Sequence, residues 1–258
     1  MHRKTFSAIL YVLILVSSIL SACSAVAPEP TATSTSQPTA TVTLTPTNTA
    51  TPTKTPRPTA TPNLAATERF EGFNEEIQSY FDLGYVDTND GEIKEIDDFA
   101  HEWAKLNYYN WLPLGKNVSD FAMSGHFKWE SAYKNADESG CGFAFAIQDD
   151  YSHYAVFLDR SRVIFVDADA SYGGYARSVG KTRGSGTVKF GNPGEADFAL
   201  IIKGTSAYVL VNNELIGEYT LSKSRILRGD VGPTILSGTN KDYGTRCEMN
   251  DLHIWTPK

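Results

Sequence analysis

The chain of 258 residues has few of the residue types that metal and catalytic centres need. Its three cysteines and five histidines show no zinc-ligand spacing. A nucleophile elbow, a P-loop and a dinucleotide-binding glycine pattern are absent as well. The glycine-rich segment 180–191 lacks strand-to-helix context, so we interpret it as an exposed loop or edge hairpin. We therefore expect no cofactor and no catalytic metal.

Positive charge is scarce where the folded part begins. The formal net charge is −7, from 23 basic and 30 acidic residues. Residues 65–102 contain 2 basic and 12 acidic residues, whereas residues 103–258 contain 17 of each. This distribution has no basic stripe of the kind that nucleic acids require, which argues against a nucleic-acid partner. The acidic segment is typical of a solvated helix face, with a cation site as the alternative.

Long apolar runs are absent except at the start of the chain. A basic HRK at 2–4 precedes the uncharged run Phe6–Leu20, whose 15 residues are fewer than the roughly 20 that a membrane span needs. This pattern is typical of an export signal. The residues Leu20-Ser21-Ala22-Cys23 resemble the bacterial lipobox, in which the cysteine is acylated. The alternative is cleavage after Ala27, but the rigid ring of Pro28 fits poorly after a scissile bond.

These features predict a lipoprotein signal peptide over 1–22 and a palmitate-type anchor on Cys23. The protein would then be exported and would face outward from the cell membrane. Residues 28–63 contain 14 threonines and 8 prolines and almost no large apolar side chain. Such a composition cannot bury enough surface to offset ordering entropy, so residues 23–63 are predicted to be a disordered stalk.

The segment 64–98 is predicted to be a helical and hairpin leader. Apolar residues recur at helical spacing between 64 and 83, and Gly84 is a plausible terminator; the apolar positions are Leu64, Phe70, Phe73, Ile77, Tyr80 and Phe81. The motif DTNDG at 87–91 approaches a calcium-binding loop, but its glycine comes one residue early. We prefer a tight turn at Asp90-Gly91 that joins extended pieces at 85–88 and 92–96. A structural calcium site is the alternative.

Helical periodicity is absent from residue 99 onward, and strand patterns replace it. Apolar residues alternate over 121–129 and 141–147, and further short strands are expected over 154–159, 162–167, 198–203, 206–211, 214–221, 231–236 and 248–255. Many short strands at this spacing indicate a sandwich. We predict a mainly β chain: a two-sheet antiparallel jelly-roll sandwich over 99–258, preceded by one short helix and the Thr/Pro linker.

The strand sequences resemble the concanavalin A-like lectin/glucanase family, including LamG-like and 3-keto-disaccharide hydrolase-like domains of bacterial lipoproteins. The resemblance spans 119–257 and is carried by SDFAMSGHFKWES, GCGFAFAIQDDYSHYAVFLDR, DFALIIKGTSAYVLVNNELIGEYT, GDVGPTILSG and CEMNDLHIWTP. It implies carbohydrate binding along a concave sheet, which the small residues Gly142, Ala144 and Ala146 would floor. Some members of the family cleave saccharides.

The catalytic pattern of the family's glucanases, E-x-D-x-x-E, is missing here. Asp167 and Asp169 are the carboxylates that come closest to this pattern, and we interpret them as turn formers. Ala146 stands where the keto-disaccharide group often has an arginine. The sequence therefore disfavours an enzyme without excluding one, and we assign no catalytic residue.

Two cysteines remain once Cys23 carries lipid. An exported domain with an even pair in predicted strands suggests a disulfide between Cys141 and Cys247, with two buried thiols as the alternative. Closing a loop of about 105 residues contributes on the order of 4–5 kcal/mol in the chain-entropy model.

Sugar binding needs an aromatic face beside polar groups that hydrogen-bond hydroxyls. The candidates are Tyr172, Tyr175, Asp169, Arg177, Trp111, Tyr154 and Tyr243. We expect a monomeric lipid-anchored protein that binds an extracellular ligand, with a polysaccharide or other glycan as the first choice. A saccharide hydrolase or lyase and a non-catalytic envelope scaffold are the alternatives.

Overall fold

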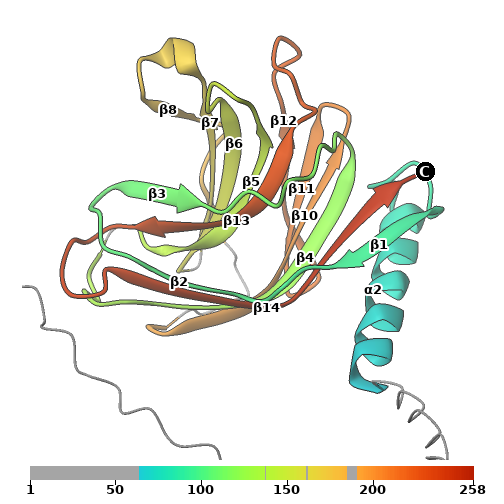
Figure 1. Ribbon diagram of the computed structural model, residues 1–258, viewed down its shortest axis with the longest axis horizontal. Coiled ribbons are helices and arrows are strands. Elements are labelled where there is room, and N and C mark those ends of the chain that lie inside the picture. The colour runs from blue at the N-terminus through green and yellow to red at the C-terminus, as the bar shows by residue number, and fades with distance from the viewer. Residues whose placement is uncertain (1–63, 137, 161, 185–190) are drawn as a thin grey trace, which may run out of the picture. The chain divides into compact units, whose positions relative to one another are not determined.

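The computed structural model describes residues 64–258 except 137, 161 and 185–190 (Figure 1). The predicted signal peptide, Cys23 and the stalk therefore lie outside the described residues. The part that is described contains one α-helix, α2 (Leu64–Asp82), a short 3-10 helix, η1 (Ala170–Tyr172), and two antiparallel sheets. Its α2 is not both long and apolar enough to cross a membrane, nor is any other described helix.

Sheet A has the strand order β1-β14-β4-β10-β11-β12, and β2 also pairs with β14. Its strands are β1 (Gly91–Glu95), β2 (Phe99–Trp103), β4 (Phe121–Ser131), β10 (Gly194–Lys203), β11 (Ser206–Val211), β12 (Glu214–Thr220) and β14 (Thr245–Pro257). The long strand β14 holds β1 along residues 253–257 and β2 along residues 245–249.

Sheet B has the order β3-β13-β5-β6-β7-β8, with β9 paired to β7. Its strands are β3 (Tyr108–Trp111), β5 (Gly140–Ile147), β6 (His153–Asp159), β7 (Arg162–Ala168), β8 (Ala176–Ser178), β9 (Arg183–Gly184) and β13 (Asp230–Ser237). The predicted fold class is confirmed: two antiparallel sheets form a β-sandwich that follows one helix.

Alternating side chains build the core between the sheets. Phe127 on β4 and Phe143 on β5 face each other with ring centroids 5.1 Å apart, and both are fully buried. Edge-to-face contacts of this kind stabilise aromatic pairs beyond their area burial. The disulfide between Cys141 on β5 and Cys247 on β14 is confirmed, with a Cα–Cα distance of 5.8 Å. It joins sheet B to sheet A covalently.

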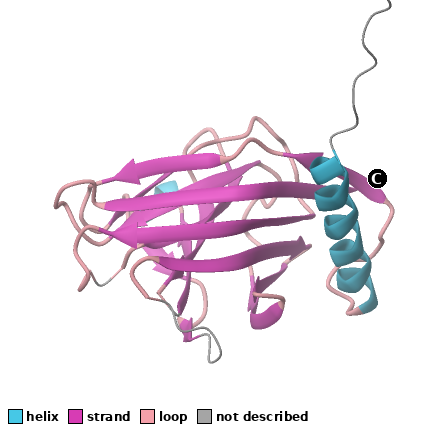
Figure 2. Ribbon diagram, turned by 90° about the horizontal axis from the view of Figure 1, so that it is seen from below, coloured by secondary structure: helices cyan, strands magenta, loops and turns pink. Residues whose placement is uncertain are grey.

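Helix α2 packs on the outer face of sheet A (Figure 2). Phe73, Ile77 and Tyr80 form its buried stripe, and they contact a patch of the sheet made by Ala122, Ala199, Ile201, Leu210 and Trp255. The predicted stripe was too wide, because Phe70 and Phe81 are 49% and 40% exposed. Both lie at the side of the stripe, where the helix surface curves away from a nearly flat sheet.

The prediction that residues 85–88 and 92–96 pair as a hairpin is wrong. Residues 85–88 form no strand, and β1 pairs with β14 instead. The end of β14 offers a whole row of backbone groups, which satisfies more donors and acceptors than a two-stranded ribbon would. The tight turn predicted at Asp90-Gly91 is also wrong, because Gly91 already begins β1; before it, Asp90 donates its N–H to Oγ1 of Thr88 at 3.0 Å. Within the described ranges, no group of three or more His, Cys, Asp or Glu side chains is placed to hold a metal ion.

The remaining hairpins follow their turn residues. Asn212 and Asn213 have φ values of 50° and 63° between β11 and β12, as the tolerance of asparagine for this region predicts. The β6–β7 and β10–β11 hairpins also match the expected ranges. In the segment 180–191, Arg183–Gly184 forms the short strand β9 against β7.

Candidate functional site

Three loops at one end of the sandwich bring most of the predicted ligand residues together. Asp169, Tyr172 and Tyr175 lie in or beside the loop 169–175 between β7 and β8, and Arg177 lies on β8. Tyr154 is the second residue of β6 and pairs in register with Asp167 of β7. The other two loops are 148–152, between β5 and β6, and 221–229, between β12 and β13.

Arg225 in the loop 221–229 fastens this loop to the end of β7. Its guanidinium forms ion pairs with Asp169 and with Asp167, the latter at 3.3 Å, and it donates to the carbonyl oxygen of Ala168 at 3.0 Å. The side chains of Arg225 and Asp167 are only 10% and 12% exposed, so water competes little for these contacts. Arg225 was not among the residues predicted from the sequence, because a single arginine in a loop carries no motif.

The side chains of Tyr154 and Asp169 contact other groups of the protein and are not free to bind a ligand. Tyr154 is 1% exposed, its ring lies 5.4 Å from the Arg225 guanidinium carbon, and its hydroxyl accepts the Ser222 N–H at 3.2 Å. Asp169 caps η1 by accepting from N and Oγ of Ser171 at 2.8 and 2.6 Å. These hydrogen bonds lower the pKa of Asp169, and the turn-forming role predicted for this residue is confirmed.

The loop 148–152 joins the other two. Ala170 N donates to Oγ of Ser152 at 3.0 Å, and Nε2 of Gln148 donates to the carbonyl oxygen of Arg228 at 2.9 Å. Each of the three loops is thus hydrogen-bonded or ion-paired to the others.

Large apolar side chains are exposed at the tips of these three hydrogen-bonded loops. Tyr151 is 73% exposed, Tyr175 is 78% exposed and Ile226 is 68% exposed. Tyr172 is partly covered by the Arg177 guanidinium, which stacks 3.7 Å from its ring centre, and its hydroxyl donates to Asp167 at 3.2 Å. We call Tyr151, Tyr172, Tyr175 and Arg177 the loop rim.

The outer face of sheet B continues from the loop rim through His153. Nδ1 of His153 lies 2.6 Å from the carbonyl oxygen of Tyr151 and therefore donates, so Nε2 accepts from the Tyr109 hydroxyl at 2.8 Å. Burial lowers the pKa of His153 and keeps it neutral in this arrangement. Burial also raises the pKa of Tyr109 to about 12. Trp111 packs against His153 with ring centroids 4.3 Å apart and remains partly exposed.

The small residues expected to floor an open groove are covered instead. Gly142, Ala144 and Ala146 are buried, and Ala144 lies in a cluster with Phe157 and Leu236 that Tyr109 and Trp111 pack against. The expectation of an open concave floor was wrong, because the aromatic rings of the edge strand β3 fold over the sheet. Tyr243 lies elsewhere, before β14, where Arg246 stacks 4.4 Å from its ring.

No family model matches this chain, and no curated protein matches it. Among solved structures, the chain resembles the carbohydrate binding module CBM66 from Bacillus subtilis, with a TM-score of 0.46 and 10% identity over 64% of this chain and 95% of that one. It also resembles sheep galectin-11 in complex with glycerol (TM-score 0.38, 9% identity, 58% and 98% covered). A third is Aspergillus kawachii beta-fructofuranosidase complexed with glycerol (TM-score 0.39, 13% identity, 64% and 27% covered). We transfer no ligand and no residue role from these structures.

Proposed function

We propose that this chain is a carbohydrate-binding module of the cell surface, with the loop rim and Trp111 as its contact surface. The observation that carries the proposal is the exposure of Tyr151 and Tyr175, 73% and 78%, on loops that are fastened to one another. Exposed aromatic side chains that cluster on one part of a protein surface are typical of interaction sites. The C–H face of a sugar ring packs on such aromatic side chains, and its hydroxyls pair with polar neighbours.

The loop rim also offers hydrogen-bonding groups beside its rings. Arg177 and the Ser171 hydroxyl are exposed next to Tyr172. The ion pairs of Arg225 hold the loop that carries these groups, so little ordering entropy is lost when a ligand binds.

The same ion pairs disfavour hydrolysis at this surface. A glycosidase needs two carboxyl groups that are free to act as acid and as base or nucleophile. Asp167 and Asp169 are both paired with Arg225, and Asp169 also caps η1. Binding without cleavage is therefore the function that we propose.

The test is a glycan array probed with the purified full-length chain in detergent. We expect Tyr175→Ala to bind about tenfold more weakly than the wild type, because an aromatic contact contributes roughly 1–1.5 kcal/mol. Tyr133→Ala is the matched control, since Tyr133 is also exposed but lies in the loop at the opposite end of β5. Failure of the wild type to bind any glycan would overturn the proposal in favour of a scaffold role.

We also propose that Cys23 anchors the protein to the outward face of the membrane by lipid. The support is the lipobox-like stretch LSAC at 20–23 and the short apolar run before it. Cell fractionation of Cys23→Ser, with Ser24→Ala as control, tests this. Retention of the Cys23→Ser variant in the membrane fraction would contradict lipid anchoring.

A further inference from the structure

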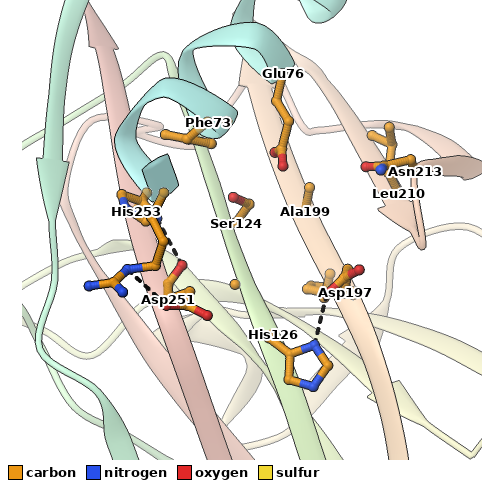
Figure 3. A pocket seen from close by; sticks show the side chains of 14 residues that line it. Phe73, Glu76, Ser124, His126, Asp197, Ala199, Leu210, Asn213, Asp251 and His253 are labelled. Atoms are coloured by element: carbon orange, nitrogen blue, oxygen red, sulfur yellow. Dashed lines mark hydrogen bonds and ion pairs between the residues drawn. The ribbon is translucent and has the colours of Figure 1, made fainter. Parts of the chain in front are cut away.

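A second surface feature, remote in sequence from the loop rim, is a cavity of about 240 Å³ between α2 and the outer face of sheet A (Figure 3). Its roof is the first half of α2, and its floor is formed by β4, β10, β11 and β14. Gly72 contributes no side chain to the roof, and a Cβ there would meet nothing within 4 Å. The cavity is therefore open to solvent beside the helix.

The cavity has an apolar side and a polar side. The apolar side is made by Phe73, Ala199 and Leu210. Hydroxyl, amide and carboxylate groups occupy the remainder, and Figure 3 shows Glu76 reaching from the helix toward Ser124, with Asp197 farther along the floor. This combination of one apolar wall with converging polar groups is typical of sites for small polar ligands.

The carboxylates of the cavity outnumber its cations. Arg69 is shared by Asp251 at 3.0 Å and Glu95 at 3.2 Å. His126 is likewise shared by Asp197 at 2.8 Å and Glu195 at 3.1 Å. The described residues that line the cavity thus include three carboxylates, Glu76, Asp197 and Asp251, against one arginine and two histidines, and Arg69 alone among them is always charged.

Glu76 is the carboxylate without a positive partner. It accepts hydrogen bonds from the Tyr80 hydroxyl, at 3.1 Å, and from the Ser124 side chain, but none of the described residues forms an ion pair with it. Burial raises the pKa of Glu76, and the nearby charge of Asp197 adds to the effect. A cation placed between these two groups would relieve both penalties.

We propose that this cavity binds an amino sugar, with the protonated amine between Glu76 and Asp197. The ammonium group supplies the positive charge that the cavity lacks. The hydroxyls of the sugar pair with Ser124 and Asn213, and its C–H face lies toward Phe73 and Leu210. This site is on the opposite sheet from Trp111 and does not depend on the function proposed for the loop rim.

Isothermal titration calorimetry of the full-length chain with glucosamine tests the proposal. Glucose and N-acetylglucosamine are the neutral comparisons, and we expect each to bind at least tenfold more weakly than glucosamine. Glu76→Gln should weaken glucosamine binding at least tenfold. Glu75→Gln is the matched control, because the carboxylate of Glu75 is next to Glu76 on the same helix but is exposed and does not line the cavity.

Three outcomes would overturn this assignment. They are no glucosamine binding in the millimolar range, equal binding by Glu76→Gln, and equal affinity for Nα-acetyl-lysine amide, which carries the amine without the sugar. The Tyr175→Ala variant must keep its affinity for glucosamine, so failure here is distinguishable from failure at the loop rim. A circular dichroism spectrum shows whether Glu76→Gln remains folded.

Proton release gives a second readout. At a pH where Glu76 is partly protonated, an arriving ammonium favours the ionised form, so the wild type should release protons on binding and Glu76→Gln should release fewer. The other titratable groups around the cavity are Arg69, Tyr80, His126, Asp197, Asp251 and His253. Equal release by the two proteins, measured in buffers of different ionisation enthalpy, would contradict the role given to Glu76.

Discussion

Arg225 and Glu76 are both partly buried, but the groups around Arg225 have the opposite charge to its own, and those around Glu76 do not. Arg225 meets two carboxylates and a carbonyl oxygen, so its charge is compensated and it fastens the loops 169–175 and 221–229. Glu76 meets the hydroxyl groups of Tyr80 and Ser124 and another carboxylate, so no opposite charge compensates its own. Burial of an uncompensated charge costs stability, and the cost is smallest when the carboxyl is protonated.

The first prediction concerns the pH dependence of stability that Glu76 causes. The pKa of Glu76 in the folded protein lies above its ordinary value of 4.5. As pH rises from 4.5 through the folded pKa, the unfolded chain ionises first, so the free energy of unfolding falls across that window. Glu76→Gln should remove this part of the decrease, whereas Glu75→Gln should retain it. Urea denaturation at a series of pH values measures both, and identical profiles for Glu76→Gln and the wild type would contradict the prediction.

At the level of elements, α2 is attached to the sandwich mainly by one apolar stripe. Phe73, Ile77 and Tyr80 are each at most 3% exposed, and they pack on side chains of β10, β11 and β14. Residues 83–90 connect the helix to β1, and no disulfide of the described residues crosslinks it to the sheet. Its docking therefore depends on side-chain packing more than on helix propensity.

The second prediction follows from this stripe. Ile77→Ala should destabilise the docked helix by about 2 to 5 kcal/mol, because it removes buried methyl groups and leaves a cavity. Amide hydrogen exchange should then speed up along α2 more than along β4, which keeps its own sheet partners on both sides. Gln78→Ala is the control, since Gln78 is exposed on the same helix. Unchanged exchange along α2 in Ile77→Ala would show that the stripe is not what holds the helix.

At the level of the whole molecule, the disulfide ties the two sheets together. Cys141 and Cys247 are 106 residues apart in sequence and lie on strands of different sheets. Both are fully buried in the core between the sheets.

The third prediction is the cost of removing this crosslink. The double variant Cys141→Ala/Cys247→Ala should lose about 4.7 kcal/mol of unfolding free energy in the chain-entropy model, since the closed loop has about 100 residues. Reduction of the wild type under denaturing conditions, followed by refolding without oxidant, should give a similar loss. An unchanged urea midpoint would show that the bond contributes nothing to stability.

The sequence by itself determined the local features of this protein. The period of two over 121–129 and the period of 3.6 over 70–80 depend only on neighbouring residues, so strands and helix were predictable. The asparagine pair 212–213 indicated its turn, and an even number of remaining cysteines indicated the disulfide. Tyr172, Tyr175 and Arg177 were chosen from the sequence because aromatic and basic residues cluster there within a few positions, and their role in ligand binding stays a prediction.

Only the tertiary structure decided which distant segments meet. The pairing of β1 with β14 replaced a local hairpin, and the rings of Tyr109 and Trp111 covered a floor that strand alternation alone had left open. Arg225 and Glu76 gained their importance from partners far away in the chain. Burial and charge compensation depend on everything that surrounds a side chain, and periodicity reports only which side of its own element that side chain occupies.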